Sequence, residues 1–225
     1  MPNSQSYSAV SQQQTGALAQ NKVLRNTYML LSMTLLFSGA TAGMSMAMDL
    51  PHPGMILTLV GYFGLLWATS ALRNSAWGIL AVFALTGFMG LTLGPIISQY
   101  LTMFSNGGQL VMTALGGTGA IFLGLSGYAV TTKKDFSFLG GFVVVGVLVA
   151  FLAGLGAALF QIPALSLAVS AAFVLLMSAL ILWETSNIIQ GGEDNYIMAT
   201  VGLFVAIFNL FTSLLHLLGA FAGED

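Results

Sequence analysis

Cysteine and charge are what this 225-residue chain has least of. It contains no cysteine, which excludes disulfides, thiolate nucleophiles and metal sites built on Cys ligands. Only 5% of its residues are charged, against about 25% in an ordinary soluble domain. Its net charge of −2 offers no basic surface for nucleic acid. The composition therefore excludes a water-soluble enzyme and a nucleic-acid-binding protein.

Hydrophobic residues, in contrast, make up 57% of the chain and gather in long runs separated by short polar breaks. Each run has about 19–26 residues, and a helix needs around 20 to cross the hydrocarbon core of a bilayer. The sequence therefore predicts an all-α membrane protein, with the lipid bilayer as its surroundings and seven transmembrane helices. The predicted spans are 26–48, 54–72, 77–99, 108–130, 137–159, 164–189 and 196–219.

The chain divides into a polar tail and a membrane domain. Residues 1–21 are rich in Gln, Ser and Asn and carry no charge, which predicts a disordered tail. The first apolar run starts only after Arg25 and is too long for a signal peptide, so we expect an uncleaved first span. The seven-helix transmembrane domain is predicted over residues 22–225.

The few positive charges predict the orientation of the bundle. Lys22 and Arg25 precede the first span, Arg73 lies between the second and third, and Lys133 and Lys134 lie between the fourth and fifth. With seven spans, all five fall on one side of the membrane. The positive-inside rule makes that side cytoplasmic, so we expect a cytoplasmic amino terminus and a carboxyl terminus on the outer side.

Many of the 27 glycines pair with another small residue four positions away. Such spacing lets helix backbones approach closely, which predicts a tightly packed bundle, although glycines that line a pore or act as hinges remain an alternative. The registers are Gly39 with Gly43, Gly90 with Gly94, Gly116 with Ala120 and Gly124, Gly146 with Ala150 and Gly154, and Gly202 with Ala206.

Glu184 is the clearest functional candidate, because an ionisable side chain inside a bilayer is costly. It lies about 9 Å of helix rise before the end of the sixth span. We interpret it as a proton-responsive or cation-binding group, with Arg73, Lys133 and Lys134 available on the same membrane side. A carboxylate that reaches water at the interface, or a purely structural ion pair, is the alternative.

The seventh span carries Asn209, Ser213 and His216 on one face, which predicts interhelical hydrogen bonds. His52 is the only other histidine and lies in the first outer loop, so we expect no metal site on histidine. The sequence has no nucleophile elbow, phosphate-binding loop, zinc-protease pair or dinucleotide fingerprint. We therefore expect no enzyme and no cofactor, and rank a membrane-embedded hydrolase last.

Four segments together resemble the Bax-inhibitor family, and most closely its bacterial YccA-like branch. The resemblance covers the chain from about Lys22 onward. Its segments are the stretch around Gly94 and Pro95, the turn Lys133-Lys134-Asp135, the run Glu184-Thr185-Ser186-Asn187 and the stretch Asn209-Leu210-Phe211.

The resemblance implies six helices around a central seventh. In several family members two Asp residues on spans six and seven share a proton and gate a pH-sensitive calcium leak. Here the first position is Glu184 and the second falls at Ala206, so the dicarboxylate is broken. Calcium prefers six to eight oxygen ligands, and Glu184 with Thr185, Ser186 and Asn209 would form a poor site.

The YccA-like branch implies a bacterial inner-membrane protein that binds and modulates an FtsH-type AAA protease. Such a protease grips an unstructured cytoplasmic end, and the tail of residues 1–21 would suit that role. Our leading hypothesis is a non-enzymatic modulator of this kind. The alternative is a pH-sensitive calcium or cation leak gated by protonation of Glu184.

Overall fold

The computed structural model describes residues 4–223, with side chains from residue 20 onward. It contains seven helices and, within the described residues, no strand. Each of the seven includes a stretch long and apolar enough to cross a membrane, which confirms the predicted fold class. The helices are α1 (Ser4–Ala47), α2 (Met55–Leu72), α3 (Ala76–Met103), α4 (Gly107–Thr132), α5 (Phe138–Leu159), α6 (Pro163–Gln190) and α7 (Tyr196–Ala222).

The apolar stretch of α1 runs from Gln20 to Ala47. The other six predicted spans agree with their helices to within a few residues. Helix α1 is assigned from Ser4, so its backbone runs through most of residues 1–21, where the sequence predicts a disordered tail. Side chains are described only from residue 20, and the disorder stays a prediction.

The helix ends follow from local chemistry. Pro163 occupies the first turn of α6, where its missing N–H costs nothing. Gly191 ends the same helix in the left-handed region, at φ 79°, which glycine adopts without steric penalty. Asn195 caps α7 because its side chain accepts the backbone N–H groups of Ile197 and Met198.

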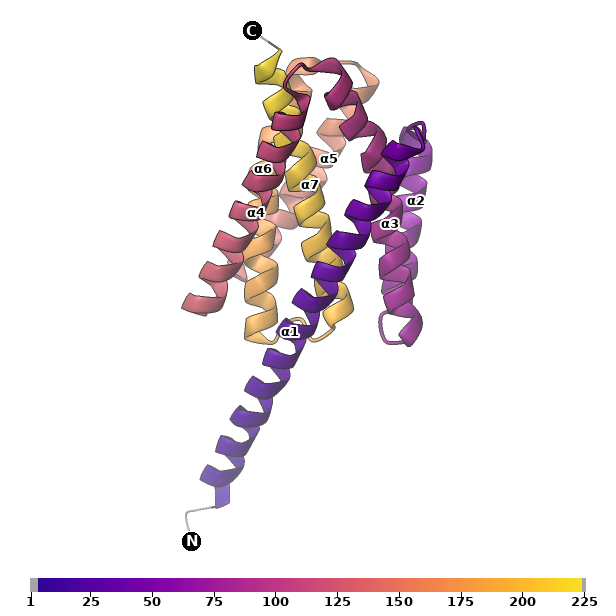
Figure 1. The fold of residues 1–225 in the computed structure, drawn as a ribbon. Helices are drawn as coiled ribbons and strands as arrows, with labels where there is room; N and C mark the ends of the chain where they lie inside the picture. Colours follow the sequence, from indigo (N-terminus) through magenta and orange to yellow (C-terminus); the bar gives the residue numbers. More distant parts are fainter. Residues whose placement is uncertain (1–3, 224–225) are drawn as a thin grey trace.

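Helix α7 lies in the centre of the bundle (Figure 1). It packs against α1, α3, α4 and α6, and Leu203, Phe204 and Leu210 on it are fully buried. The outer helix α2 packs along α3, and α5 packs along α6. Both α2 and α5 expose most of their surface, as expected for helices that face lipid. The arrangement of six helices around a central seventh is confirmed.

The small residues divide into two groups. A Cβ on Gly90 would collide with the Ser38 carbonyl oxygen, and one on Gly94 would lie 2.6 Å from Ser45 Cβ, so α1 and α3 need glycine to approach. Gly146 likewise admits the Leu176 side chain between α5 and α6. These positions confirm the prediction of close packing.

The same prediction is wrong for two other registers. Gly39 and Gly43 on α1, and Gly116 and Gly124 on α4, have nothing within 4 Å of an added Cβ, and these four residues are exposed. They point out of the bundle, because a four-residue spacing marks a helix face without saying which way that face turns.

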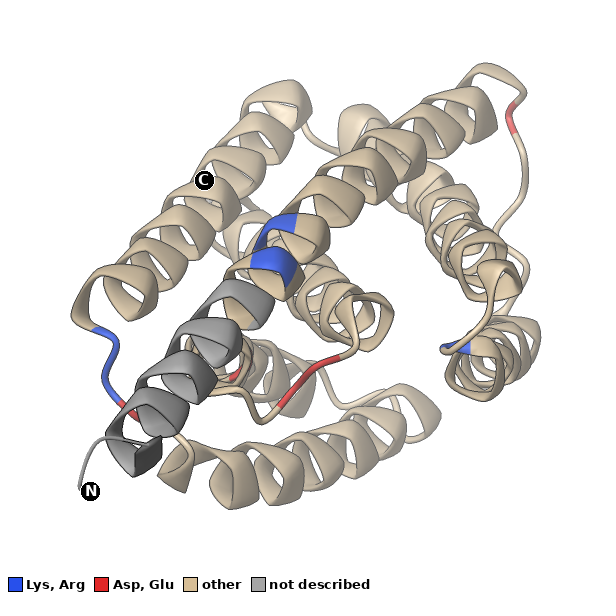
Figure 2. Ribbon diagram, turned by 90° about the horizontal axis from the view of Figure 1, so that it is seen from below, with Lys and Arg blue, Asp and Glu red and all other residues tan. Residues whose placement is uncertain are grey.

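All five lysines and arginines lie at one end of the bundle, seen end-on in Figure 2. Lys22 and Arg25 lie at the start of the apolar stretch of α1, Arg73 lies in the turn between α2 and α3, and Lys133 and Lys134 lie in the turn between α4 and α5. We call this the charged end. That this end faces the cytoplasm stays a prediction.

Candidate functional site

The carboxyl group of Glu184 lies between α6 and α7, directly over Gly202. A Cβ on Gly202 would lie 2.8 Å from Glu184 Cδ, so the missing side chain provides the space for the carboxyl group. Among the described residues no hydrogen bond or ion pair engages Glu184, and Arg73, Lys133 and Lys134 form none with it. Glu184 therefore faces the central helix rather than the cations at the charged end.

Ala206 lies one helical turn from Gly202 and is fully buried. It belongs to the same apolar cluster as Ile181 on α6 and Leu210 on α7. At the position where the family resemblance leads us to look for a second carboxyl group, the chain has a tightly enclosed methyl group.

Thr185, the next residue on α6, links three helices. Its hydroxyl lies 3.4 Å from the Tyr28 hydroxyl on α1 and 3.3 Å from the Ser126 hydroxyl on α4. Thr185 is fully buried, so these contacts satisfy a polar group that would otherwise be costly to bury.

Ser186 fastens the turn between α4 and α5 to α6. Its hydroxyl donates to the Lys134 carbonyl at 3.0 Å and accepts the Phe136 N–H at 3.0 Å. One helical turn further on, the Gln190 side chain donates to the Lys133 carbonyl at 2.8 Å. The α6 motif and the turn motif, which are far apart in the sequence, therefore meet in the fold. The contact is made to the backbone carbonyls of Lys133 and Lys134.

Asp135 shapes the start of α5 from the same turn. Its carboxylate accepts the Ser137 N–H at 2.8 Å. This hydrogen bond to the charged form holds the pKa of Asp135 below its usual value of 3.8. The side chain is fully exposed, so its role is to order the turn rather than to bind within the bundle.

Arg73 is held through its backbone. Its carbonyl accepts a hydrogen bond from the Asn195 side-chain amide at 3.0 Å, and the same amide donates to Asn74 Oδ1 at 3.0 Å. Asn195 thus joins the turn between α2 and α3 to the start of α7. Our sequence reasoning missed Asn195, although an Asn directly before a long apolar run is a signal of a helix cap.

Gly94 and Pro95 form a contact with α1 that follows from the proline itself. Pro95 lies inside α3 and has no N–H to donate to the Leu91 carbonyl four residues earlier. The Ser45 hydroxyl on α1 donates to that carbonyl at 2.9 Å. Gly94 lets Ser45 come close enough to do so, which gives this motif a structural role.

The polar residues on one face of α7 do not all bond to a neighbouring helix. His216 Nδ1 lies 2.8 Å from the Ser170 hydroxyl on α6, which confirms the predicted interhelical hydrogen bond at that position. At Asn209 the prediction is wrong. Its amide donates to the Val205 carbonyl of its own helix at 2.8 Å, because a neighbouring helix does not fill the space beside it.

The weak calcium site predicted around Glu184 is not assembled. Glu184 faces Gly202, while Asn209 lies seven residues further along α7, about 10 Å of helix rise away. Thr185 and Ser186 turn to other elements. Within the described residues no three His, Cys, Asp or Glu side chains form a group that could hold a metal ion.

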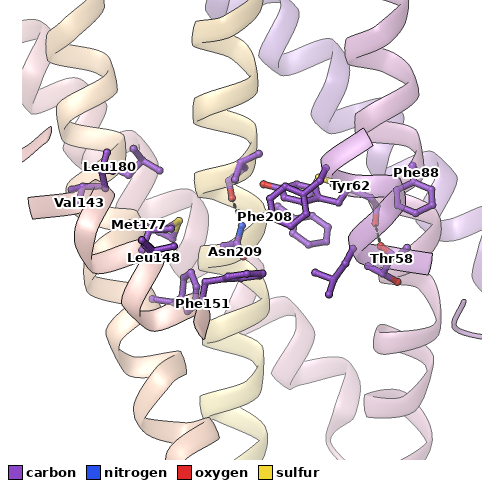
Figure 3. Close-up of a pocket in the computed structure, with 18 residues that line it drawn as sticks. Thr58, Tyr62, Phe88, Val143, Leu148, Phe151, Met177, Leu180, Phe208 and Asn209 are labelled. Atoms are coloured by element: carbon purple, nitrogen blue, oxygen red, sulfur yellow. Dashed lines mark hydrogen bonds between the residues drawn. The ribbon is translucent and has the colours of Figure 1, made fainter. Parts of the chain in front are cut away.

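A cavity of about 560 Å³ lies beside Asn209, between the pair α2–α3 and the pair α5–α6 (Figure 3). Aromatic, aliphatic and methionine side chains form most of its wall, including Phe88, Phe151, Met177 and Phe208. None of the residues that line it is charged, and Glu184 is not among them. Its lining residues come from five helices, so sequence reasoning had no local signal for it.

Comparison with known proteins identifies the bundle. A family profile described as "Inhibitor of apoptosis-promoting Bax1" matches residues 20–223. The chain is 50% identical over 215 residues to the Escherichia coli K12 protein named "Modulator of FtsH protease YccA", covering 96% of this chain and 97% of that one. An uncharacterized protein of Pseudomonas aeruginosa is 54% identical over 203 residues, covering 90% and 91% of the two chains. An uncharacterized membrane protein of Vibrio cholerae is 41% identical over 209 residues, covering 92% and 93%.

The family profile runs from the apolar stretch of α1 through α7 and includes all four of the motifs that predicted it. The seven-helix membrane bundle, with α7 at its centre, is a member of the Bax-inhibitor family.

Proposed function

We propose that this protein is a multi-pass inner-membrane protein that binds an FtsH-type membrane AAA protease and modulates its action on other membrane proteins. The observation that carries the proposal is the 50% identity, over nearly the full length of both chains, to a protein named as a modulator of that protease. The proposed role is non-enzymatic, and the protease is the partner.

The mechanism we propose uses the amino-terminal end. Residues 1–21 precede the membrane domain at the charged end, which the distribution of Lys and Arg predicts to be cytoplasmic. There the protease could engage the chain, while Ser186, Gln190 and Asn195 fasten the turns of the bundle together. A bundle that resists extraction would occupy the protease and spare other substrates.

The test is affinity purification of the full chain from native bacterial membranes. We expect the protease to co-purify, and deletion of residues 1–20 to abolish the association. The matched control replaces those 20 residues with a Gly/Ser sequence of equal length, which should restore binding if the protease needs only an unstructured end. Failure of the protease to co-purify with the intact chain would overturn the proposal.

A second candidate function is a pH-sensitive calcium or cation leak gated by Glu184. Supporting it is the placement of this carboxyl group inside α6, against the central helix and without a hydrogen-bonding partner among the described residues. Calcium flux into proteoliposomes should then depend on pH and vanish in Glu184→Gln. Asp194→Asn, an exposed carboxylate in the turn outside the spans, is the control. Flux that Glu184→Gln leaves unchanged would exclude this gate.

A further inference from the structure

The cavity beside Asn209 opens sideways, at the depth of the membrane spans. Its lining residues with the largest exposed fractions are Phe63 on α2, at 50%, and Val144 and Leu148 on α5, at 63% and 57%. The mouth therefore lies between α2 and α5. Both helices present apolar residues beside it, so the medium at the mouth is the hydrocarbon of the bilayer.

The wall of the cavity offers few polar groups to a ligand. The side-chain donors of Thr58, Thr92 and Asn209 are each engaged by a backbone carbonyl of the same chain segment, at 2.8 Å in every case. The Tyr62 hydroxyl also lies in the wall and has no hydrogen-bonding partner among the described residues. With no charged residue in the wall, an ion would lose its hydration without compensation. An apolar cavity also stays dry, because water needs several polar partners. The chemistry that fits is a hydrocarbon.

The shape of the cavity favours a narrow chain. Helix α5 lines it from Val143 to Phe151, about 12 Å of helix rise. The rings of Phe63 and Phe151 meet edge to face across the mouth, with centroids 5.9 Å apart, and join α2 to α5. A helix with its side chains is about 10 Å wide and would have to separate this pair, whereas a single hydrocarbon chain is much thinner.

We propose that this cavity binds one acyl chain of a membrane phospholipid, which enters between α2 and α5 and lies against Phe208 and Asn209 of the central helix (Figure 3). The site is distinct from Glu184 and from the proposed contact with the protease. Entry of the chain transfers hydrocarbon from one apolar medium to another, so it breaks no hydrogen bond of the wall.

The experiment uses the full-length protein in vesicles of phosphatidylethanolamine and phosphatidylglycerol that contain a phospholipid with a diazirine in the middle of one acyl chain. After illumination, peptide mass spectrometry maps the adducts. We expect adducts on residues 205–209 of α7, which the flanking helix pairs separate from the surrounding lipid, as well as on the outward face of α5. Absence of adducts on α7 would overturn the proposal.

A matched pair of variants on α5 sharpens the test. Val147 lines the cavity, and Val149 on the same helix points outward with 60% of its surface exposed. Val147→Phe should reduce the α7 adducts severalfold, because the larger ring fills space in the cavity that the chain would occupy. Val149→Phe should leave them unchanged, and adducts on the outward face serve as the internal standard. Equal α7 adducts in both variants would refute the site.

A measurement on the unmodified protein decides the matter even if Val147→Phe does not fold. A diazirine close to the glycerol backbone should give few α7 adducts relative to the mid-chain probe, because the cavity lies deep in the spans. Equal labelling by both probes would overturn the proposal. Cross-links from α7 to a partner polypeptide in native membranes, in place of lipid, would overturn it in favour of a protein ligand.

Discussion

The charged end of the bundle and the apolar cavity in its middle are built in opposite ways. At the charged end, polar side chains of α6 and of Asn195, the cap of α7, hold the turns through directed hydrogen bonds to backbone groups. Around the cavity, α2 is joined to α5 by a single aromatic contact, and Thr92 and Asn209 donate to carbonyls of their own helices. Hydrogen bonds fix a position, whereas contacts between apolar surfaces in lipid gain little over contacts with lipid itself.

We therefore expect substitutions at the charged end to change the stability of the fold, and substitutions at the cavity to change what the protein binds.

The largest loss of stability should come from Asn195→Ala. This substitution removes the cap of α7 and both hydrogen bonds to the turn between α2 and α3, for a combined cost of roughly 2 kcal/mol. Thermal unfolding in detergent would measure it. Asn106→Ala is the matched control, because Asn106 precedes α4 without a side-chain cap bond and should change stability little. Equal losses of stability in the two variants would contradict the role of Asn195 in joining α7 to the turn between α2 and α3.

Ser186→Ala should follow, at about 1–2 kcal/mol. It leaves the Lys134 carbonyl and the Phe136 N–H without their partner, so the turn between α4 and α5 should loosen. Hydrogen exchange of that turn, measured by mass spectrometry, reports the effect directly. Ser178→Ala on the same helix loses only a bond to its own backbone and should leave the exchange unchanged.

Ser45→Ala should cost about 0.6–1 kcal/mol, because it deprives the Leu91 carbonyl of its donor beside Pro95. The decisive measurement is a double-mutant cycle with Pro95→Ala. The alanine restores an N–H that the carbonyl can accept within α3, so Ser45→Ala should cost less in that background. Identical costs in both backgrounds would show that the proline does not create the need for Ser45.

At the cavity, Phe63→Ala should cost only about 0.5 kcal/mol of stability, the contribution of one aromatic pair. It removes the ring that narrows the mouth, so labelling of α7 by the mid-chain lipid probe should rise. Trp67→Ala, an exposed residue of the same helix outside the cavity wall, should leave labelling unchanged. A fall in labelling with Phe63→Ala would place the entrance elsewhere.

The smallest expected effect is on the stability of the fold at low pH. The Ser137 N–H lowers the pKa of Asp135 in the folded state, so the stabilisation is present above the ordinary value of 3.8 and is lost as the pH falls through the lowered pKa. Asp135→Asn should flatten that part of the curve of unfolding free energy against pH. A curve with the same slope in both proteins would exclude a contribution from this carboxyl group.

The motif residues show where sequence reasoning ended. The family resemblance singled out the segment with Ser186 and the turn with Lys133 and Lys134, and the bundle joins the two through hydrogen bonds from Ser186 and Gln190. Thr185, in the same segment, instead contacts Tyr28 on α1 and Ser126 on α4. Sequence reasoning interpreted Asn209 as an interhelical donor, and Asn209 instead borders a cavity. The identity of a polar residue indicates that it needs a partner, but the partner belongs to another helix or to its own, depending on packing.

The sequence by itself determined that this protein lies in a lipid bilayer and that it crosses the bilayer with seven helices. Its scarcity of charge and the length of its apolar runs leave a seven-helix membrane bundle as the solution, because hydrocarbon demands that backbone groups be satisfied within each span. Only the tertiary structure decided which glycines face a neighbour, that Glu184 lies over Gly202, and that a cavity opens between α2 and α5. Those features depend on how helices far apart in the chain rotate and pack, and no local pattern of residues specifies that rotation.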